Sequence, residues 1–428
     1  MKKIARIALL LLCGILTIGA FAQGPNPPPN GGKPPRPGGG PGGEPKYTLE
    51  QAISDRAQLN TIAFSGLAFL TGSFGCDTFL PPGKVCDYFG FQNMRDVQAK
   101  GMGHNTDFLT RIANNMIFIL TDTQRAQLIA LGKDQESQIN ALALKRFPLI
   151  KSFCRQADGD IPAGSAGLNQ DAVKKYTAEI FALDGQLAYQ RAVVCGNILT
   201  NLSAEQKAYL AKLKFDDYTT WPVMAEPLDK RSMTHGTNVL VMTYASEMFS
   251  WYAGSLEADT YFCPERHGTY FGGFFMKDAP AMHQANYSIS TTLTGDSGEQ
   301  FLATLNPTQR ERITSIIELQ RADLQEMVTV RRAISTELRK LLVVGGTADK
   351  ELVLKLSRRY GELDGEMSYY YATRFAEVNK TLTTEQKAAL VKLRNMTITP
   401  RGAFVYSEPI AIPEVIKTDF LFTAPATK

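Results

Sequence analysis

The sequence is poor in the residues and motifs that build common chemical sites. It has only four His in 428 residues, and no close His pair or Cys pair completes a recognisable metal site. It also lacks a Gly-rich phosphate loop and a Ser-centred nucleophile motif. Cys263 and His267 lie near each other, but no second Cys completes a redox or haem-attachment motif. We therefore expect a protein that is not an enzyme.

The chain also lacks a strong net charge and a long internal apolar run. Its formal net charge is +4, and Lys2, Lys3 and Arg6 at the N-terminus supply three of these charges, which leaves about +1 for the rest. A nucleic-acid binder that depends on phosphate contacts needs a larger positive charge. Beyond the N-terminal segment, no stretch approaches the roughly 20 apolar residues of a membrane span. We expect neither nucleic-acid binding nor a membrane span.

The N-terminal segment has the features of a cleavable signal peptide. Residues 1–22 begin with a basic region, continue with an apolar stretch and end in Ala-Phe-Ala. The next segment, 23–46, is rich in Pro and Gly, with nine Pro and eight Gly within residues 24–45. Such a composition favours an extended, solvated backbone. We expect a periplasmic or otherwise exported protein with a disordered linker after its signal peptide.

The cysteine count is odd once the signal peptide is removed. Five Cys remain, so at least one has no partner within the chain. Cys76 and Cys86 flank a Pro-Pro-Gly turn, and an exported protein meets oxidising conditions. We expect a disulfide between these two. The pairing of Cys154, Cys195 and Cys263 stays open.

A helix-start pattern occurs four times in the sequence. In each copy a Leu precedes a capping residue, and a Gln follows three residues later. The capping side chain accepts a hydrogen bond from the Gln backbone N–H, and the Gln side chain reaches back to the capping residue's own N–H. The Gln residues within the two pairs are 82 and 77 residues apart, which suggests one helical unit written twice. The four copies are Leu120, Thr121 and Gln124; Leu202, Ser203 and Gln206; Leu305, Asn306 and Gln309; and Leu382, Thr383 and Gln386.

Other short segments repeat at nearly the same offset. Tyr88-Phe89-Gly90 returns as Tyr270-Phe271-Gly272, a shift of 182 residues. Asp184-Gly185 returns as Asp364-Gly365, a shift of 180 residues. Repetition at one period indicates a duplicated structural unit. We therefore predict two homologous helical domains, residues 47–228 and residues 229–428.

Apolar residues in both halves recur every three or four positions, which is typical of amphipathic helices. One long helix is expected from Asp171, and its copy in the second half carries the pattern through Val378. The segment after Gln309 predicts another long helix that ends near Gly345, so that these two helices fold back as a hairpin. In the first half, the helix should bend at Pro148. The expected fold is all-α, with irregular aromatic loops and extended tails.

Two glycines lie inside the predicted long helices. Gly185 and Gly365 each cost roughly 1 kcal/mol relative to Ala at such a position, so we expect a close helix approach or a hinge there. Each half also begins with a predicted helix and ends with a Pro-containing strap. These helices are expected over residues 49–70 and 236–252, and the straps over residues 215–227 and 397–413.

These features together resemble the Spy/CpxP family of bacterial periplasmic proteins, which carry paired Leu-Thr-x-x-Gln motifs on helical hairpins. The resemblance covers roughly residues 108–213 and 301–393 and leaves the aromatic loops, the tails and the linker unexplained. Asn306 replaces Thr in one motif, although Asn also caps helices well. The family includes ATP-independent chaperones, envelope-stress adaptors and metal-responsive proteins.

The resemblance implies a helical cradle that binds unfolded or envelope client proteins without a nucleotide cycle. Two halves in one chain would then make a covalent pseudo-dimer. Two alternatives stay open: a metal-binding stress sensor or adaptor, and a structural component of an envelope or extracellular assembly that self-associates. Charges on the second hairpin would help to hold a client: Arg321, Arg331, Arg332, Arg339 and Lys340.

The metal-binding alternative depends on Met and His residues that lie close together in the sequence. Met102 precedes His104 by two residues, and Met282 directly precedes His283, with the two Met at equivalent places in the two halves. Met and His together suit copper. We therefore consider copper or zinc as a cofactor at these residues. Nothing else in the sequence implies a cofactor.

Overall fold

The computed structural model describes residues 55–71, 107–213, 221–225, 227–253, 295–394, 403–405 and 408–423. The predicted signal peptide, the linker and the Tyr-Phe-Gly loops lie outside these residues. No helix in the described ranges is long and apolar enough to cross a membrane.

The described chain is mostly helical, which confirms the all-α fold class. Its long helices are α5 (Asp122–Leu144), α7 (Gln170–Thr200), α13 (Ile316–Arg339) and α14 (Lys350–Asn379). The shorter helices are α2 (Asp55–Thr71), α4 (Asp107–Ile119), α6 (Phe147–Asp158), α8 (Ala204–Lys212), α9 (His235–Ala253), α11 (Gly295–Thr304), α12 (Pro307–Thr314) and α15 (Thr384–Arg394). Single 3-10 turns are η2 (Lys230–Ser232), η4 (Lys340–Leu342) and η5 (Asp419–Leu421), and the short strands β1 (Ala403–Val405) and β2 (Glu408–Ile410) pair antiparallel.

Local sequence explains where the long helices are interrupted. Pro148 lies in the first turn of α6, where its missing N–H would have no intrahelical partner anyway. The helix predicted to bend at this residue is therefore divided into α5 and α6. Thr314 and Ser315 donate their hydroxyls back to carbonyls of the preceding turn at 3.3 and 2.9 Å, and such bonds compete with regular helix. The single helix expected after Gln309 is accordingly α12 followed by α13.

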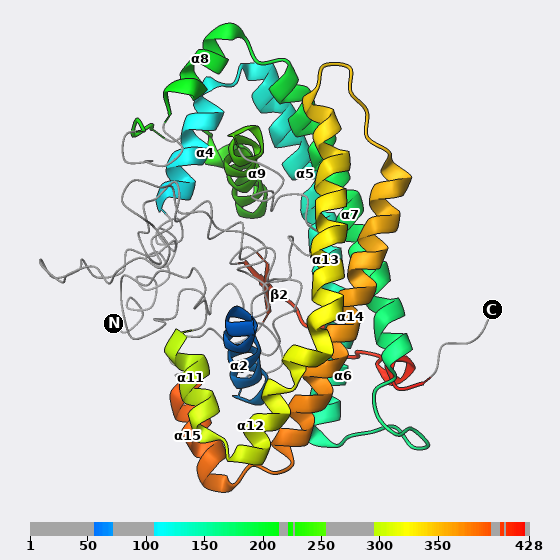
Figure 1. Ribbon diagram of the computed structural model, residues 1–428. Helices are drawn as coiled ribbons and strands as arrows, with labels where there is room; N and C mark the ends of the chain where they lie inside the picture. Colours follow the sequence, from blue (N-terminus) through cyan, green and yellow to red (C-terminus); the bar gives the residue numbers. More distant parts are fainter. Residues whose placement is uncertain are drawn as a thin grey trace, which may run out of the picture.

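The helices α7 and α14 run antiparallel and in contact, and they hold the two sequence halves together (Figure 1). Gly185 faces the side chain of Ser357, and Gly365 faces Thr177 so closely that an added Cβ would lie 3.1 Å from its side chain. Gly185 and Gly365 are 180 residues apart, as are Thr177 and Ser357. The two contacts are therefore one contact made twice with the halves exchanged. The close helix approach predicted at both glycines is confirmed.

The first described helix of each sequence half packs on the other half. Helix α2 lies against α11, α12, α13, α14 and α15, whereas α9 lies against α4, α5 and α7. In Figure 1, α2, α11 and α15 gather at one end of the long helices, and α4, α8 and α9 gather at the other. Residues 47–228 and 229–428 divide the sequence repeat, but each bundle in space takes helices from both ranges.

Buried polar contacts anchor α9 in the first bundle. Arg191 of α7 and Glu247 of α9 form an ion pair of 3.0 Å, and their side chains are only 1% and 2% exposed. The Tyr244 hydroxyl of α9 donates to Gln135 Oε1 of α5 at 2.6 Å. Buried charges and hydroxyls are costly without such partners, so these contacts select the position of α9.

An equivalent glutamine anchors α2 in the second bundle. Gln320 of α13 donates its Nε2 hydrogen to Gln58 Oε1 of α2 at 2.6 Å. Gln320 and Gln135 are 185 residues apart, and both are buried beside the helix that comes from the other half. The same position in each half therefore receives the exchanged helix.

The C-terminal tail differs from the simple strap that the sequence predicts. Its first described part forms the β1 and β2 pair, and the chain then runs without regular structure to η5. At the end of the first half, Trp221 is buried and packs edge to face on Phe249 of α9 at 4.7 Å between ring centroids. That tail therefore lies on the first bundle.

Candidate functional sites

All four predicted capping boxes are present. At α5, α8 and α12 the capping side chain accepts from the Gln N–H at 2.9 to 3.2 Å, and the Gln Oε1 accepts from the capping N–H at 2.7 to 2.9 Å. Thr383 and Gln386 form the same two bonds at 3.2 and 3.0 Å. The motif leucines are buried at three helix starts and partly buried at the fourth: Leu120, Leu202 and Leu305, then Leu382.

The first two motifs are joined through their glutamines. Gln206 donates its Nε2 hydrogens to Gln124 Oε1 at 2.7 Å and to the Ile119 carbonyl at 2.6 Å. Gln124 Nε2 donates to the Asn201 carbonyl at 3.4 Å. Ile119 and Asn201 each precede the Leu of their own motif. Each glutamine therefore caps its own helix and also holds the start of the partner motif.

The second pair of motifs repeats this arrangement. Gln386 Nε2 donates to Gln309 Oε1 at 2.8 Å and to the Thr304 carbonyl at 2.9 Å. Gln309 Nε2 donates to the Thr381 carbonyl at 2.9 Å. Since a buried amide that loses its partner costs about 1–3 kcal/mol, these glutamines stabilise the end of each bundle.

A buried group of charges lies where the two halves meet, and sequence reasoning missed Arg146 and the burial of Arg331. Arg146 is 3% exposed, and burial lowers its pKa to about 10 against the attraction of the Asp364 and Asp184 carboxylates. Arg331 is 0% exposed and follows Arg146 by 185 residues, the same offset that separates the first glutamines of the two motif pairs. That offset would have identified Arg146 and Arg331 as equivalent residues of the two halves.

Several charges expected to hold a client have partners within the protein. The prediction is wrong for Arg331, because its side chain is fully buried. Arg321 pairs with Asp55 of α2 at 2.6 Å, so it fastens the exchanged helix. Lys340 pairs with Glu337 at 2.6 Å. Arg321 and Lys340 are therefore engaged in ion pairs within the protein.

A cluster of carboxylates and cations joins α7, α13 and α14. Burial and, to a smaller extent, the neighbouring Glu366 carboxylate raise the pKa of Asp323 to about 6, against the opposing effect of Lys174 and Arg359. Glu366 forms an ion pair with Lys174 and accepts from Gln170 at 2.8 Å. Asp323 therefore changes its protonation state close to neutral pH.

A cleft of about 380 Å³ opens between α6, α13 and α14. Its wall combines aromatic, aliphatic and charged side chains, and Arg374 forms an ion pair with Glu377 at 3.0 Å along its edge. Such a mixed surface suits segments of a protein chain better than one small molecule of fixed shape. The residues that define it include Gln156, Leu319, Tyr369, Tyr370, Arg374 and Lys380.

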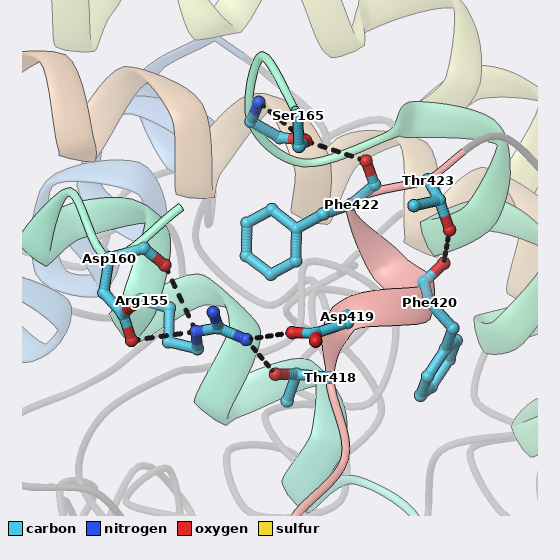
Figure 2. A network of polar contacts seen from close by, with 9 residues as sticks. Arg155, Asp160, Ser165, Thr418, Asp419, Phe420, Phe422 and Thr423 are labelled. Atoms are coloured by element: carbon cyan, nitrogen blue, oxygen red, sulfur yellow. Dashed lines mark hydrogen bonds and ion pairs between the residues drawn. The ribbon is translucent and has the colours of Figure 1, made fainter. Parts of the chain in front are cut away.

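The C-terminal segment Thr418–Thr423, here called the anchor segment, binds the loop of residues 159–169 between α6 and α7, here called the anchor loop (Figure 2). Within the anchor segment, Leu421 is 0% exposed and Phe422 is 4% exposed. Burial of a side chain of either type contributes about 1.5–3 kcal/mol. The sequence predicted an extended tail but not the site where the tail binds.

The predicted metal ligands Met102, His104, Met282 and His283 lie outside the described residues, so the metal prediction stays a prediction. Within the part of the chain that the structure describes, no group of three or more His, Cys, Asp or Glu side chains is arranged to hold a metal ion.

The cysteine predictions are tested only in part. Cys76, Cys86 and Cys263 also lie outside the described residues. Cys154 and Cys195 form no disulfide. Burial raises the pKa of the Cys195 thiol to about 12, so this thiol stays protonated and chemically inert at neutral pH.

No known protein family, curated protein or solved structure matches the chain. The resemblance to the Spy/CpxP family therefore depends on the motifs of this sequence, and function has to be argued from the sites described above.

Proposed function

We propose that the chain is an exported, non-enzymatic protein of the Spy/CpxP type that holds unfolded or partner proteins without ATP. We further propose that its two bundles act as two Spy/CpxP-like units, which a chaperone of this family would supply as the two subunits of a dimer. The observation that carries the proposal is the pairing of the motif glutamines, Gln124 with Gln206 and Gln309 with Gln386. The same bonds fix the helix starts once in each bundle.

The cleft beside α14 is the described surface that we propose for contact with a partner. Leu319, which is 38% exposed, and the tyrosine rings offer apolar area, while Arg374 and Lys380 offer positive charge. Such a surface makes moderate contacts with many sequences, because aromatic rings and long cationic side chains each combine apolar and polar atoms. Weak, reversible binding of varied segments is what an ATP-independent chaperone requires.

The test is suppression of aggregation of a chemically denatured protein, measured by light scattering without nucleotide. We expect suppression near equimolar ratio, and we expect Leu319→Ser and Arg374→Gln to raise the ratio that is required. Val344→Ser is the matched control, because this valine is 81% exposed beyond the opposite end of α13. Failure of the unmodified chain at several-fold molar excess would contradict the proposal.

A further inference from the structure

The polar contacts of the anchor segment resemble those of a bound peptide. Arg155 Nη1 donates to Thr418 Oγ1 at 2.7 Å and to Asp419 Oδ1 at 2.6 Å, as Figure 2 shows. The Asn169 backbone N–H donates to the Leu421 carbonyl at 2.8 Å. Side-chain and main-chain bonds together fix both the direction and the register of this segment.

Apolar contacts alternate with these polar ones. The Arg155 guanidinium lies 5.1 Å from the ring centroid of Phe422, which is a cation–π distance. Phe420 packs edge to face on Tyr176 of α7 at 5.2 Å between ring centroids. Ser165 donates its hydroxyl to the Phe422 carbonyl at 2.8 Å. The binding site that Arg155, Tyr176 and the anchor loop form thus contacts a carboxylate followed by aromatic, aliphatic and aromatic residues.

The segment is joined to the rest of the tail by an exposed stretch. Val415 is 78% exposed, and all residues from 411 to 417 are exposed or only partly buried. Ile412 and Ile416 are the side chains of this stretch that pack against the core, and the anchor segment adds the contacts described above. A tethered ligand of this kind has an effective concentration on the order of millimolar.

Among the described residues, this binding site for the tail occurs in one half only. Equivalent residues are 185 positions apart before the anchor loop, at Arg146 and Arg331, and 180 positions apart after it, at Asp184 and Asp364. The connection between α6 and α7 is therefore five residues longer than its counterpart in the second half. Joining two helices does not require these additional residues, and Ser165 within this loop binds the anchor segment.

We propose that the anchor loop is a peptide-binding site that the chain's own tail occupies, and that it exchanges this tail for an external segment with the pattern hydroxyl, carboxylate, aromatic, aliphatic, aromatic. The tail holds the site closed to weak competitors, because any external segment has to displace a tethered one. This inference is independent of the chaperone proposal, since it needs neither client aggregation nor the cleft beside α14.

The test uses the full chain with three tail substitutions, Asp419→Asn, Leu421→Ser and Phe422→Ala, together called the unlatched variant. The probe is a fluorescein-labelled synthetic peptide with the sequence of residues 417–423, and binding is followed by anisotropy. We expect saturable binding to the unlatched variant and at least about tenfold weaker binding to the unmodified chain, because the tethered tail competes. Adding Arg155→Ala should weaken binding by about ten- to a hundredfold, since hydrogen bonds from a charged donor are lost.

Arg125→Ala in the unlatched variant is the matched control, because Arg125 forms its ion pair with Asp122 on α5, away from the anchor loop. The proposal is overturned if the unlatched variant keeps its helical circular dichroism and yet binds no peptide, or binds a scrambled peptide equally well. Dimers of the unmodified chain that disappear in the unlatched variant would assign the site to the tail of a second copy, and would also overturn it.

A second measurement needs no variant. Hydrogen exchange of the Asn169 amide reports release of Leu421, whereas the Val173 amide, which donates to the Asn169 carbonyl at 3.0 Å, reports opening of α7. We expect Asn169 to exchange at least about tenfold faster and to slow when excess unlabelled peptide is present. Equal protection of the two amides would mean that the tail does not exchange, and would overturn the proposal.

Discussion

Gln206 and Gln124 are 82 residues apart in sequence, and the Gln206 side-chain amide donates to Gln124 Oε1 at 2.7 Å. Each of these side chains also closes the capping box of its own helix. One bond between two side chains therefore couples the start of α5 to the start of α8. The same coupling occurs between Gln309 and Gln386 in the other bundle.

This bond predicts non-additive stability changes. Gln124→Ala and Gln206→Ala should each lower the free energy of unfolding by about 1–3 kcal/mol, because buried partners lose their hydrogen bonds. The double variant should lose less than the sum of the two, by about 0.5–3 kcal/mol. Urea denaturation measures all three. Gln138→Ala, on the exposed side of α5, should change stability by less than about 0.5 kcal/mol, and strict additivity of the first two would contradict direct coupling.

The buried ion pair between α7 and α9 predicts a large effect of a single carboxylate. Glu247→Ala would leave the Arg191 guanidinium buried without its ion-pair partner, so unfolding should cost about 3–5 kcal/mol less. Hydrogen exchange should show that the amides of α9 open before those of α7. Glu179→Ala, an exposed carboxylate on α7, should have little effect. Unchanged protection of α9 in the Glu247 variant would show that this pair does not anchor the exchanged helix.

The contact between α7 and α14 predicts that a substitution favourable to helix formation is harmful. A Cβ added at Gly361 would lie 2.8 Å from the Ala178 Cα and from the Thr177 carbonyl oxygen. Backbone atoms cannot rotate away, so Gly361→Ala should destabilise by about 1–3 kcal/mol, although helix propensity alone favours Ala by about 1 kcal/mol. Arg358→Ala, an exposed change on the same helix, serves as the control in thermal denaturation. A more stable Gly361 variant would refute the close contact.

The raised pKa of Asp323 predicts a dependence of stability on pH. Its pKa is about 6 in the folded protein and 3.8 in a free side chain, so the folded state binds this proton more tightly. The contribution of Asp323 to the free energy of unfolding should therefore become more favourable as the pH falls from above 6 towards 4. Asp323→Asn removes the penalty and should be more stable at pH 7 by about 1 kcal/mol, discounted for partial exposure.

The difference between the Asp323→Asn variant and the unmodified protein should close near pH 4. Chemical denaturation at several pH values measures it. A constant difference across this range would show that the Asp323 carboxyl is not the group responsible.

Features that depend on residues a few positions apart were predictable from the sequence. The capping boxes join residues three positions apart, so Thr121 and Gln124 identify one without any knowledge of the fold. The predicted helix over residues 236–252 corresponds to α9 (His235–Ala253) for a similar reason, because helical periodicity is a local property. Gly185 and Gly365 indicated a close helix approach because glycine is otherwise unfavourable inside a helix.

Features that join distant residues were not predictable in the same way. Nothing near Arg146 in the sequence shows that the Asp184 and Asp364 carboxylates will face it. The sequence of the tail indicated a strap, but the binding site that Arg155 and Ser165 form for the tail lies in the first half of the chain.

The sequence by itself determined where helices begin, which of their faces require burial, and that the helical unit occurs twice. Only the tertiary structure decided that α2 and α9 each join the bundle of the other half, which glutamines bond to each other, and where the tail binds. The physical reason is that burial of apolar surface has no direction and depends mainly on area. A helix with an apolar face must therefore be covered. The identity of the covering helix follows from specific polar contacts such as Arg191 with Glu247, whose residues are far apart in the sequence.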